Sequence, residues 1–250
     1  KNTAVFQFRA LQARMERFES FPEAVDGFFS LIGGAGNENI LITPVTQKTA
    51  LIIVTSDEGF MGSLNSQVID LARLQYDFKE ASLIIVGERG AHQLEGLGLS
   101  FTPYRSAADD ARRAALAEEL TGFIIRGVRK GEFGRVKVLY PKPVSFMYQK
   151  AEAVDILPLF KEVPRKRQPA PDARELITES PINGVIDYLA EKVIEQKLLN
   201  ILEDSKLSEF AARAIHLESS SQELTEKRRK VKLQYFRAYH EMIDKSTREL

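Results

Sequence analysis

The sequence of 250 residues contains no cysteine and no tryptophan, and its 35 basic and 35 acidic side chains cancel to a formal net charge of zero. The lack of cysteine excludes disulfides, thiolate zinc sites and cysteine nucleophiles. The charge balance argues against nucleic acid as a partner, because such binding needs surplus Lys and Arg to displace counterions. The apolar runs at 50–54 and 83–86 are far shorter than the roughly 20 residues that span a bilayer. Since no signal peptide is visible either, we expect a soluble intracellular protein.

The middle of the chain alternates short β-branched, apolar runs with amphipathic stretches. Residues 50–55 and 82–87 have the composition of strands buried on both faces, and residues 66–79 space their apolar side chains as a helix does. A second amphipathic helix is expected over 107–130, and short strands follow at 136–140 and 144–148. Because the strand–helix–strand order implies a right-handed crossover between parallel strands, we predict a Rossmann-like α/β domain.

Both ends of the chain have helical patterns. Residues 5–21 place apolar side chains three and four apart on one face, and after Pro181 there is no further proline and only one glycine. A helix from Pro181 to the end would be roughly 100 Å long, too long for one domain of this size to bury along its whole length. Its outer part carries an apolar seam with alternating steps of three and four, which indicates a left-handed coiled coil. The seam consists of Leu207, Phe210, Ala214, Leu217, Ser221, Leu224, Arg228, Val231, Tyr235, Ala238 and Met242.

These patterns predict a long antiparallel coiled coil formed by the N- and C-terminal helices, with the α/β domain inserted between them. The expected boundaries are 1–34 for the N-terminal helix, 35–160 for the α/β domain and 181–250 for the long C-terminal helix. Residues 161–180 contain three prolines among basic side chains and are expected to form a linker.

The most distinctive stretch is the loop at 55–65, because α/β proteins usually bind ligands at the carboxyl ends of parallel strands. In an enzyme, Ser56 or Ser63 could act as the nucleophile, with Asp57 or Glu58 as its base. Against this reading, no Ser–His–Asp set is evident, and the loop lacks the Gly-Lys-Ser/Thr ending of a phosphate cradle. We favour a strand-to-helix turn and expect no catalytic, cofactor-binding or metal-binding residues.

Four motifs, in the right order along the chain, resemble those of one family, the gamma subunit of rotary (F-type) ATP synthases. The loop at 55–65 reads T-S-D-E-G-F-M-G-S-L-N and resembles the family's T-S-D-R-G-L-C-G-G-L-N. Residues 208–214 resemble S-E-H-A-A-R-M, and residues 1–3 match the K-N-T that opens the family's first helix. The family's Q-K and L-L-P-L are similar to residues 149–150 and 156–159.

The resemblance implies a rotor subunit of the central stalk and no catalytic activity of its own. In that family the paired terminal helices form a shaft inside a ring of alternating alpha and beta subunits, and shaft rotation links ion flow to ATP synthesis or hydrolysis. The α/β domain sits at the foot, beside the epsilon subunit and the membrane ring of c subunits. A peripheral position on the cytoplasmic face of the inner (plasma) membrane is therefore expected, with no cofactor.

Partner contacts are expected at two places, the exposed basic part of the long helix and the segment just before that helix begins. The candidate residues are Lys227, Arg228, Arg229, Lys232, Arg237, His240, Leu176, Ile177 and Glu179.

The chain also departs from the family pattern, which indicates a divergent member. Glu58 stands where the family motif has Arg, and residues 235–240 read Y-F-R-A-Y-H in place of Y-N-R-A-R-Q. Two alternative functions stay open on the sequence. One is an α/β enzyme or nucleotide-binding protein with a coiled-coil dimerisation tail, and the other is a structural adaptor that dimerises through residues 207–242.

Overall fold

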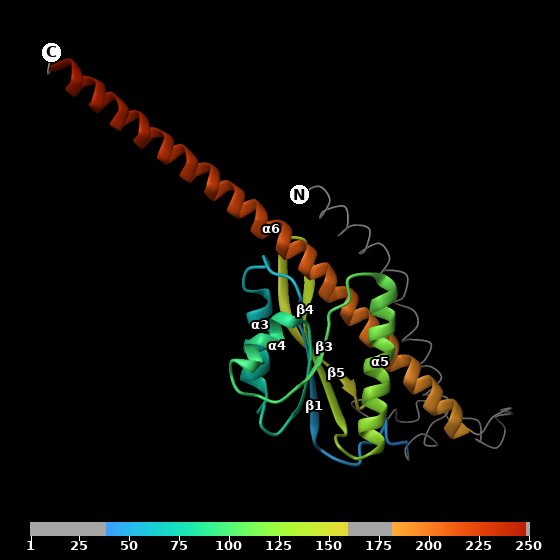
Figure 1. The fold of residues 1–250 in the computed structure, drawn as a ribbon. Coiled ribbons are helices and arrows are strands. Elements are labelled where there is room, and N and C mark those ends of the chain that lie inside the picture. The colour runs from blue at the N-terminus through green and yellow to red at the C-terminus, as the bar shows by residue number, and fades with distance from the viewer. Residues whose placement is uncertain (1–38, 160–181, 249–250) are drawn as a thin grey trace.

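A computed structural model of the chain describes residues 39–159 and 182–248 (Figure 1). A five-stranded sheet carries helices on both faces, and one very long helix, α6, crosses the sheet and continues far beyond it (Figure 1). The strands are β1 (Thr49–Val54), β2 (Ser82–Val86), β3 (Thr102–Tyr104), β4 (Arg135–Ser145) and β5 (Tyr148–Leu157). The helices are α3 (Leu64–Gln75), α4 (Glu88–Glu95), α5 (Asp110–Arg129) and α6 (Ile182–Arg248).

The sheet has the order β3-β2-β1-β4-β5, with the first four strands parallel and β5 antiparallel at one edge. The predicted α/β class and the parallel β1–α3–β2 unit are therefore confirmed. The prediction of two short strands at 136–140 and 144–148 is wrong, because β4 runs without a break through Pro141 and Pro143. Beyond Leu139, β4 pairs with β5 and no longer with β1, so a proline that lacks its N–H can face the open side.

Alternate residues of β1 belong to two different cores, as expected for a strand covered on both faces. Ala50, Ile52 and Val54 pack in the core beneath α5 and α6, whereas Leu51 and Ile53 pack in the core beneath α3 and α4. All five are at most 2% exposed. Covering both faces explains why the run is apolar throughout instead of alternating with polar residues.

The first half of α6 is an integral part of the α/β core. Its buried residues recur every three or four positions and pack with those of β1, β4 and α5. These residues are Ile186, Ala190, Val193, Ile194, Leu198, Ile201 and Leu202. The long helix is therefore fixed to the sheet over several turns before it leaves the domain.

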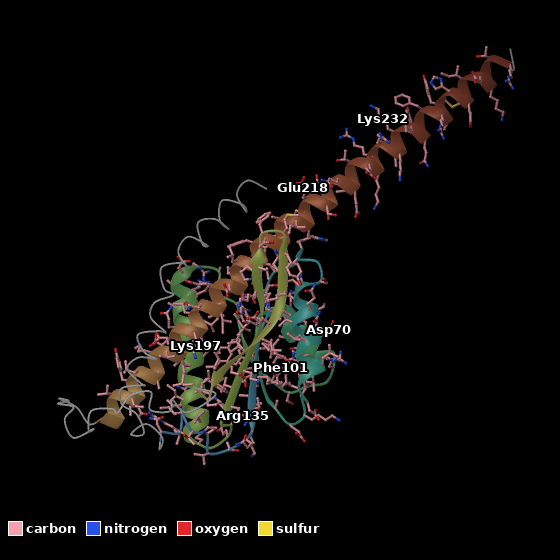
Figure 2. The ribbon with its side chains drawn as sticks, turned by 180° about the vertical axis from the view of Figure 1, so that it is seen from behind. Asp70, Phe101, Arg135, Lys197, Glu218 and Lys232 are labelled. Atoms are coloured by element: carbon pink, nitrogen blue, oxygen red, sulfur yellow. The ribbon has the colours of Figure 1, made fainter. Side chains whose placement is uncertain are left out.

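The outer half of α6 has no such cover within the described chain. Every residue from 221 to 245 is exposed, and the side chains beyond Glu218 stand out around the helix (Figure 2). The predicted seam is buried at Leu207 and Ala214, but Leu224 and Val231 are 65% and 63% exposed. Its predicted partner, residues 5–21, and the predicted linker both lie outside the described residues.

Candidate functional site

The loop that follows β1 is fastened to the end of β2 through Thr55. The Thr55 Oγ1 donates to the carbonyl oxygen of Val86 at 2.8 Å and accepts from the Gly90 N–H at 3.1 Å. Gly87 has a φ of 101°, and a Cβ on it would lie 2.3 Å from the Thr55 carbonyl oxygen. Only glycine fits there, so the carboxyl ends of β1 and β2 are held close together.

Ser56 has a structural role in this loop. Its hydroxyl donates to the Glu58 carbonyl oxygen at 2.9 Å and accepts from Asn65 Nδ2 at 2.8 Å, and Ser56 is fully buried. The second candidate nucleophile, Ser63, accepts a hydrogen bond from Gln67 Nε2 at 2.9 Å. Neither hydroxyl is paired with the base that the enzyme reading requires.

Asp57 connects three segments that follow neighbouring strands. Its Oδ1 accepts from the Glu88 N–H at 2.9 Å, at the start of α4, and from the Ser106 N–H at 3.2 Å, beyond β3. A carboxylate at a helix N-terminus is a favourable cap, because it satisfies a free N–H and faces the positive end of the helix dipole. Asp57 therefore fixes the loop and does not face a nucleophile.

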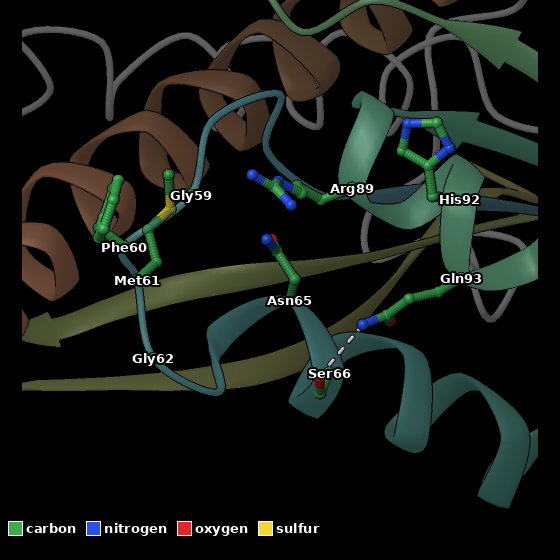
Figure 3. Close-up of a pocket in the computed structure, with 9 residues that line it drawn as sticks. All are labelled: Gly59, Phe60, Met61, Gly62, Asn65, Ser66, Arg89, His92 and Gln93. Atoms are coloured by element: carbon green, nitrogen blue, oxygen red, sulfur yellow. Dashed lines mark hydrogen bonds between the residues drawn. The ribbon is translucent and has the colours of Figure 1, made fainter.

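A shallow hollow lies beside this loop, between the start of α3 and the first turns of α4 (Figure 3). Its polar side chains are exposed or half-buried, and Gln93 Nε2 donates to Ser66 Oγ at 3.3 Å. In the described part of the chain, no group of three or more His, Asp or Glu is placed to hold a metal ion. The hollow is lined by Gly59, Phe60, Met61, Gly62, Asn65, Ser66, Arg89, His92 and Gln93.

The same loop contacts the long helix where that helix approaches the edge of the domain. Met61 and Leu64 pack with Ala212 of α6, each at most 8% exposed. Next to them, Arg213 Nη2 lies 2.7 Å from Glu58 Oε2. We call these five residues, Glu58, Met61, Leu64, Ala212 and Arg213, the collar.

The hairpin of β4 and β5 holds α6 from a second direction. The Ser208 hydroxyl donates to the Pro141 carbonyl oxygen at 2.8 Å, and both groups are buried. Phe146, at the turn of the hairpin, packs against Leu207 and Ala211. The motif at 208–214 is thus the part of α6 that contacts both the hairpin and the loop at 55–65.

A charged pair is buried in the same interface. Lys206 Nζ lies 2.8 Å from Glu209 Oε2, and the two side chains are 11% and 3% exposed. Burial raises the pKa of Glu209, and the positive charges of Lys206 and Arg213 oppose this shift. Because removal of either partner leaves an uncompensated buried charge, the pair acts as a unit.

A second carboxylate, Asp204, lies one turn earlier in α6. The Tyr140 hydroxyl donates to Asp204 Oδ2 at 3.5 Å. Burial raises the pKa of Asp204 to about 6, Lys142 opposes the shift, and the carboxylates of Glu152 and Glu203 add to it. Ionisation of Asp204 therefore lowers the stability of the folded protein at neutral pH.

We expect Asp204→Asn to stabilise the protein at pH 8 by about 2 kcal/mol and to have almost no effect at pH 4. The folded-state pKa is above the ordinary value of 3.8. The stabilising contribution of the protonated group is thus complete below about pH 4 and is lost as the pH rises through about 6. Urea unfolding of both proteins at several pH values measures the difference. The exposed Asp70→Asn is the matched control, and equal effects of the two substitutions at pH 8 would contradict this account.

The structure places the expected partner contacts of the long helix together on its outer half. Lys227, Arg228, Arg229, Lys232, Arg237 and His240 are all exposed. Between residues 227 and 237 there are six Lys and Arg side chains and no Asp or Glu, so this part of α6 is strongly positive. Leu176, Ile177 and Glu179 lie outside the described residues. Both sets remain predictions.

Aromatic residues lie among these basic side chains. The rings of Tyr235 and Tyr239 stack with centroids 6.2 Å apart, and Lys232 Nζ lies 5.8 Å from the centre of the Phe236 ring. These four residues are exposed. None of the helices in the described ranges is both long and apolar enough to cross a membrane.

Comparison with known proteins gives matches over the whole chain. A family model described as ATP synthase matches residues 1–250. The ATP synthase gamma chain of Pelotomaculum thermopropionicum is 26% identical over 230 residues, covering 91% of this chain and 80% of the relative. The gamma chain of Geobacter metallireducens is 29% identical over 220 residues, covering 82% and 72%. Among solved structures, the central stalk and c-ring of the Tetrahymena thermophila mitochondrial ATP synthase contains a chain with a TM-score of 0.61 and 21% identity, covering 88% of this chain and 96% of that one.

Proposed function

This chain belongs to the ATP synthase family, as a gamma chain, and from that premise we propose that it is the rotor subunit of the central stalk. The observation that carries the proposal is the division of α6, a helix of 67 residues. Its first half is locked into the α/β core, and its outer half projects with every residue from 221 to 245 exposed (Figure 1). A helix built in this way can transmit rotation of the domain to whatever surrounds its outer half.

We propose that the chain is a non-catalytic subunit, with ATP synthesised or hydrolysed in the ring of alpha and beta subunits. The loop considered as an enzyme site supports this. The Ser56 hydroxyl is satisfied by the Glu58 carbonyl oxygen and the Asn65 side chain, and Asp57 accepts hydrogen bonds from backbone N–H groups of neighbouring segments. The loop forms part of the interface between the domain and α6, through Met61, Leu64 and Glu58.

We propose different partners for the outer half of α6 and for the α/β domain. The ring of alpha and beta subunits surrounds the outer half of α6, and the epsilon subunit and the ring of c subunits lie against the α/β domain. The similar structures are described as a central stalk with a c-ring and as a rotor, which supports this arrangement. The complex is then a membrane-bound one, with this subunit peripheral on the cytoplasmic face of the inner (plasma) membrane.

Reconstitution tests the proposal. The chain is mixed with alpha and beta subunits from the same source, and assembly and ATP hydrolysis are measured. We expect one copy per ring of alpha and beta subunits, with hydrolysis far faster than without the chain. A chain that hydrolyses ATP alone, or that neither joins the ring nor stimulates it, contradicts the proposal.

Neutralising the basic run of α6 should weaken assembly with the ring. We expect the variant with Lys227, Arg228, Arg229 and Lys232 changed to Gln to bind less tightly at low salt and to show a flatter salt dependence, because exposed charges interact mainly through screened electrostatics. Binding is measured by titration at two salt concentrations. A control variant neutralises Lys48, Arg73 and Lys79, which are exposed on the α/β domain. If both variants bind like the parent, the basic run is only a solvated face.

A further inference from the structure

The collar lies at the place where α6 stops being part of the domain. Arg213 is about two helical turns before residue 221, from which the described helix is exposed. A lateral or twisting force on the outer half of α6 therefore reaches the domain first through the contacts in this region. Under the proposed rotor function, these contacts determine how firmly the shaft is held to the domain.

The two kinds of contact in the collar resist different motions. Met61, Leu64 and Ala212 form a small apolar contact, which is non-directional and permits the helix surface to slide. The ion pair of Glu58 and Arg213, at 2.7 Å, ties α6 to one point of the loop and favours those rotational settings of the helix that keep the two charges close. Arg213 is held by its surroundings as well, because its side chain is only 23% exposed.

Hydrogen bonds of the neighbouring residues hold the main chain of Glu58 in place beside α6. The Ser56 hydroxyl donates to the Glu58 carbonyl oxygen at 2.9 Å, and the neighbouring Asp57 carboxylate is fastened to the N–H groups of Glu88 and Ser106. The position of the Glu58 main chain is thus fixed by the ends of β1, β2 and β3. An exposed ion pair adds little to the free energy of unfolding by itself. This pair can instead affect the orientation of α6, because it lies where the helix leaves the domain.

We infer that Glu58 and Arg213 are positioning residues that set the angle of the outer half of α6 relative to the α/β domain. The pairing depends on the departure from the family motif, since an Arg at position 58 would face Arg213 and repel it. The functional importance of this angle rests on the proposed rotor function. The angle itself is tested on the isolated full chain.

The chain has no cysteine, so two introduced cysteines carry spin labels at defined places. Asp70→Cys on α3 and Lys232→Cys on the outer half of α6 are both exposed, and they lie on the α/β domain and on the projecting part of the helix, respectively (Figure 2). Pulsed electron spin resonance gives the distribution of distances between the labels, and hence the spread of shaft angles. A second pair, Asp70→Cys with Glu191→Cys, reports on the anchored half of α6 and shows whether the domain keeps its fold.

We expect Glu58→Arg and Arg213→Glu each to broaden the first distribution and to raise the population of displaced settings roughly two- to fivefold, the effect of losing one exposed ion pair. The double variant with both changes restores the pair in reverse and returns the parent distribution. Glu58→Gln, which removes the charge without repulsion, broadens it less than Glu58→Arg. The exposed Glu226→Arg on the outer half is the charge-matched control and has no effect.

Two results would overturn the inference. Either the single variants keep the parent distribution while the second label pair reports an intact domain, or the double variant is as broad as the single ones. Both results leave the reconstitution assay of the rotor function unaffected, so failure of one proposal is distinguishable from failure of the other.

Discussion

Ala214→Pro is expected to abolish the stimulation of ATP hydrolysis in the reconstituted complex. Ala214 is 7% exposed and lies in α6 directly after the collar, where the anchored and outer halves of the helix meet. Proline removes a backbone hydrogen bond and clashes with the preceding turn, at a cost of about 3 kcal/mol or more, and it kinks the helix. The outer half then leaves the domain at a different angle.

The matched control is Ala214→Gly, which costs about 1 kcal/mol and keeps all backbone hydrogen bonds. We expect this variant to assemble and to stimulate hydrolysis almost as the parent does. If the proline variant stimulates hydrolysis as well as the glycine variant, a straight and continuous α6 is not needed, and the shaft is not where we place it.

The second large effect is expected at Gly87, where a side chain has no room. With a φ of 101° and the Thr55 carbonyl oxygen 2.3 Å from the Cβ position, Gly87→Ala combines backbone strain with overpacking. We expect a loss of about 3 kcal/mol or more in the free energy of unfolding. Urea unfolding followed by circular dichroism measures the loss.

Gly98→Ala is the control that separates the backbone strain of a positive φ from the lack of space for a Cβ. Gly98 also has a positive φ, 69°, but nothing lies within 4 Å of its Cβ position. We expect this control to cost only about 1 kcal/mol. If Gly87→Ala is no worse than Gly98→Ala, then the junction of β1 and β2 is not as tight as the structure indicates.

Local patterns in the sequence predicted those parts of the fold that depend on neighbouring residues. The apolar, β-branched run of β1 and the spacing of apolar side chains in α5 each reflect burial of a single element. The continuity of α6 after Pro181 is visible because nothing in its composition interrupts a helix. The two short strands predicted on either side of Pro141 and Pro143 are not seen, because β4 is continuous there and only its pairing shows which side of the strand is open.

The interface between the domain and α6 could not be predicted in this way. Glu58 and Arg213 are 155 positions apart, and no spacing rule connects them. The position of the loop at 55–65 after a strand favours a turn, but only the hydrogen bonds of its serines and acids show what each side chain holds in place. Ser208 and Pro141 form a similar long-range pair, between a helix hydroxyl and a carbonyl within strand β4.

Rotation of this subunit inside the assembled complex tests the central claim most directly. Asp70→Cys gives the cysteine-free chain a single attachment point for a bead, on an exposed position of α3 away from the collar. With the beta subunits fixed to a surface, we expect addition of ATP to turn the bead continuously in one direction, and removal of ATP to stop it. A bead that stays in place while the complex hydrolyses ATP would contradict the account of this chain as a rotor.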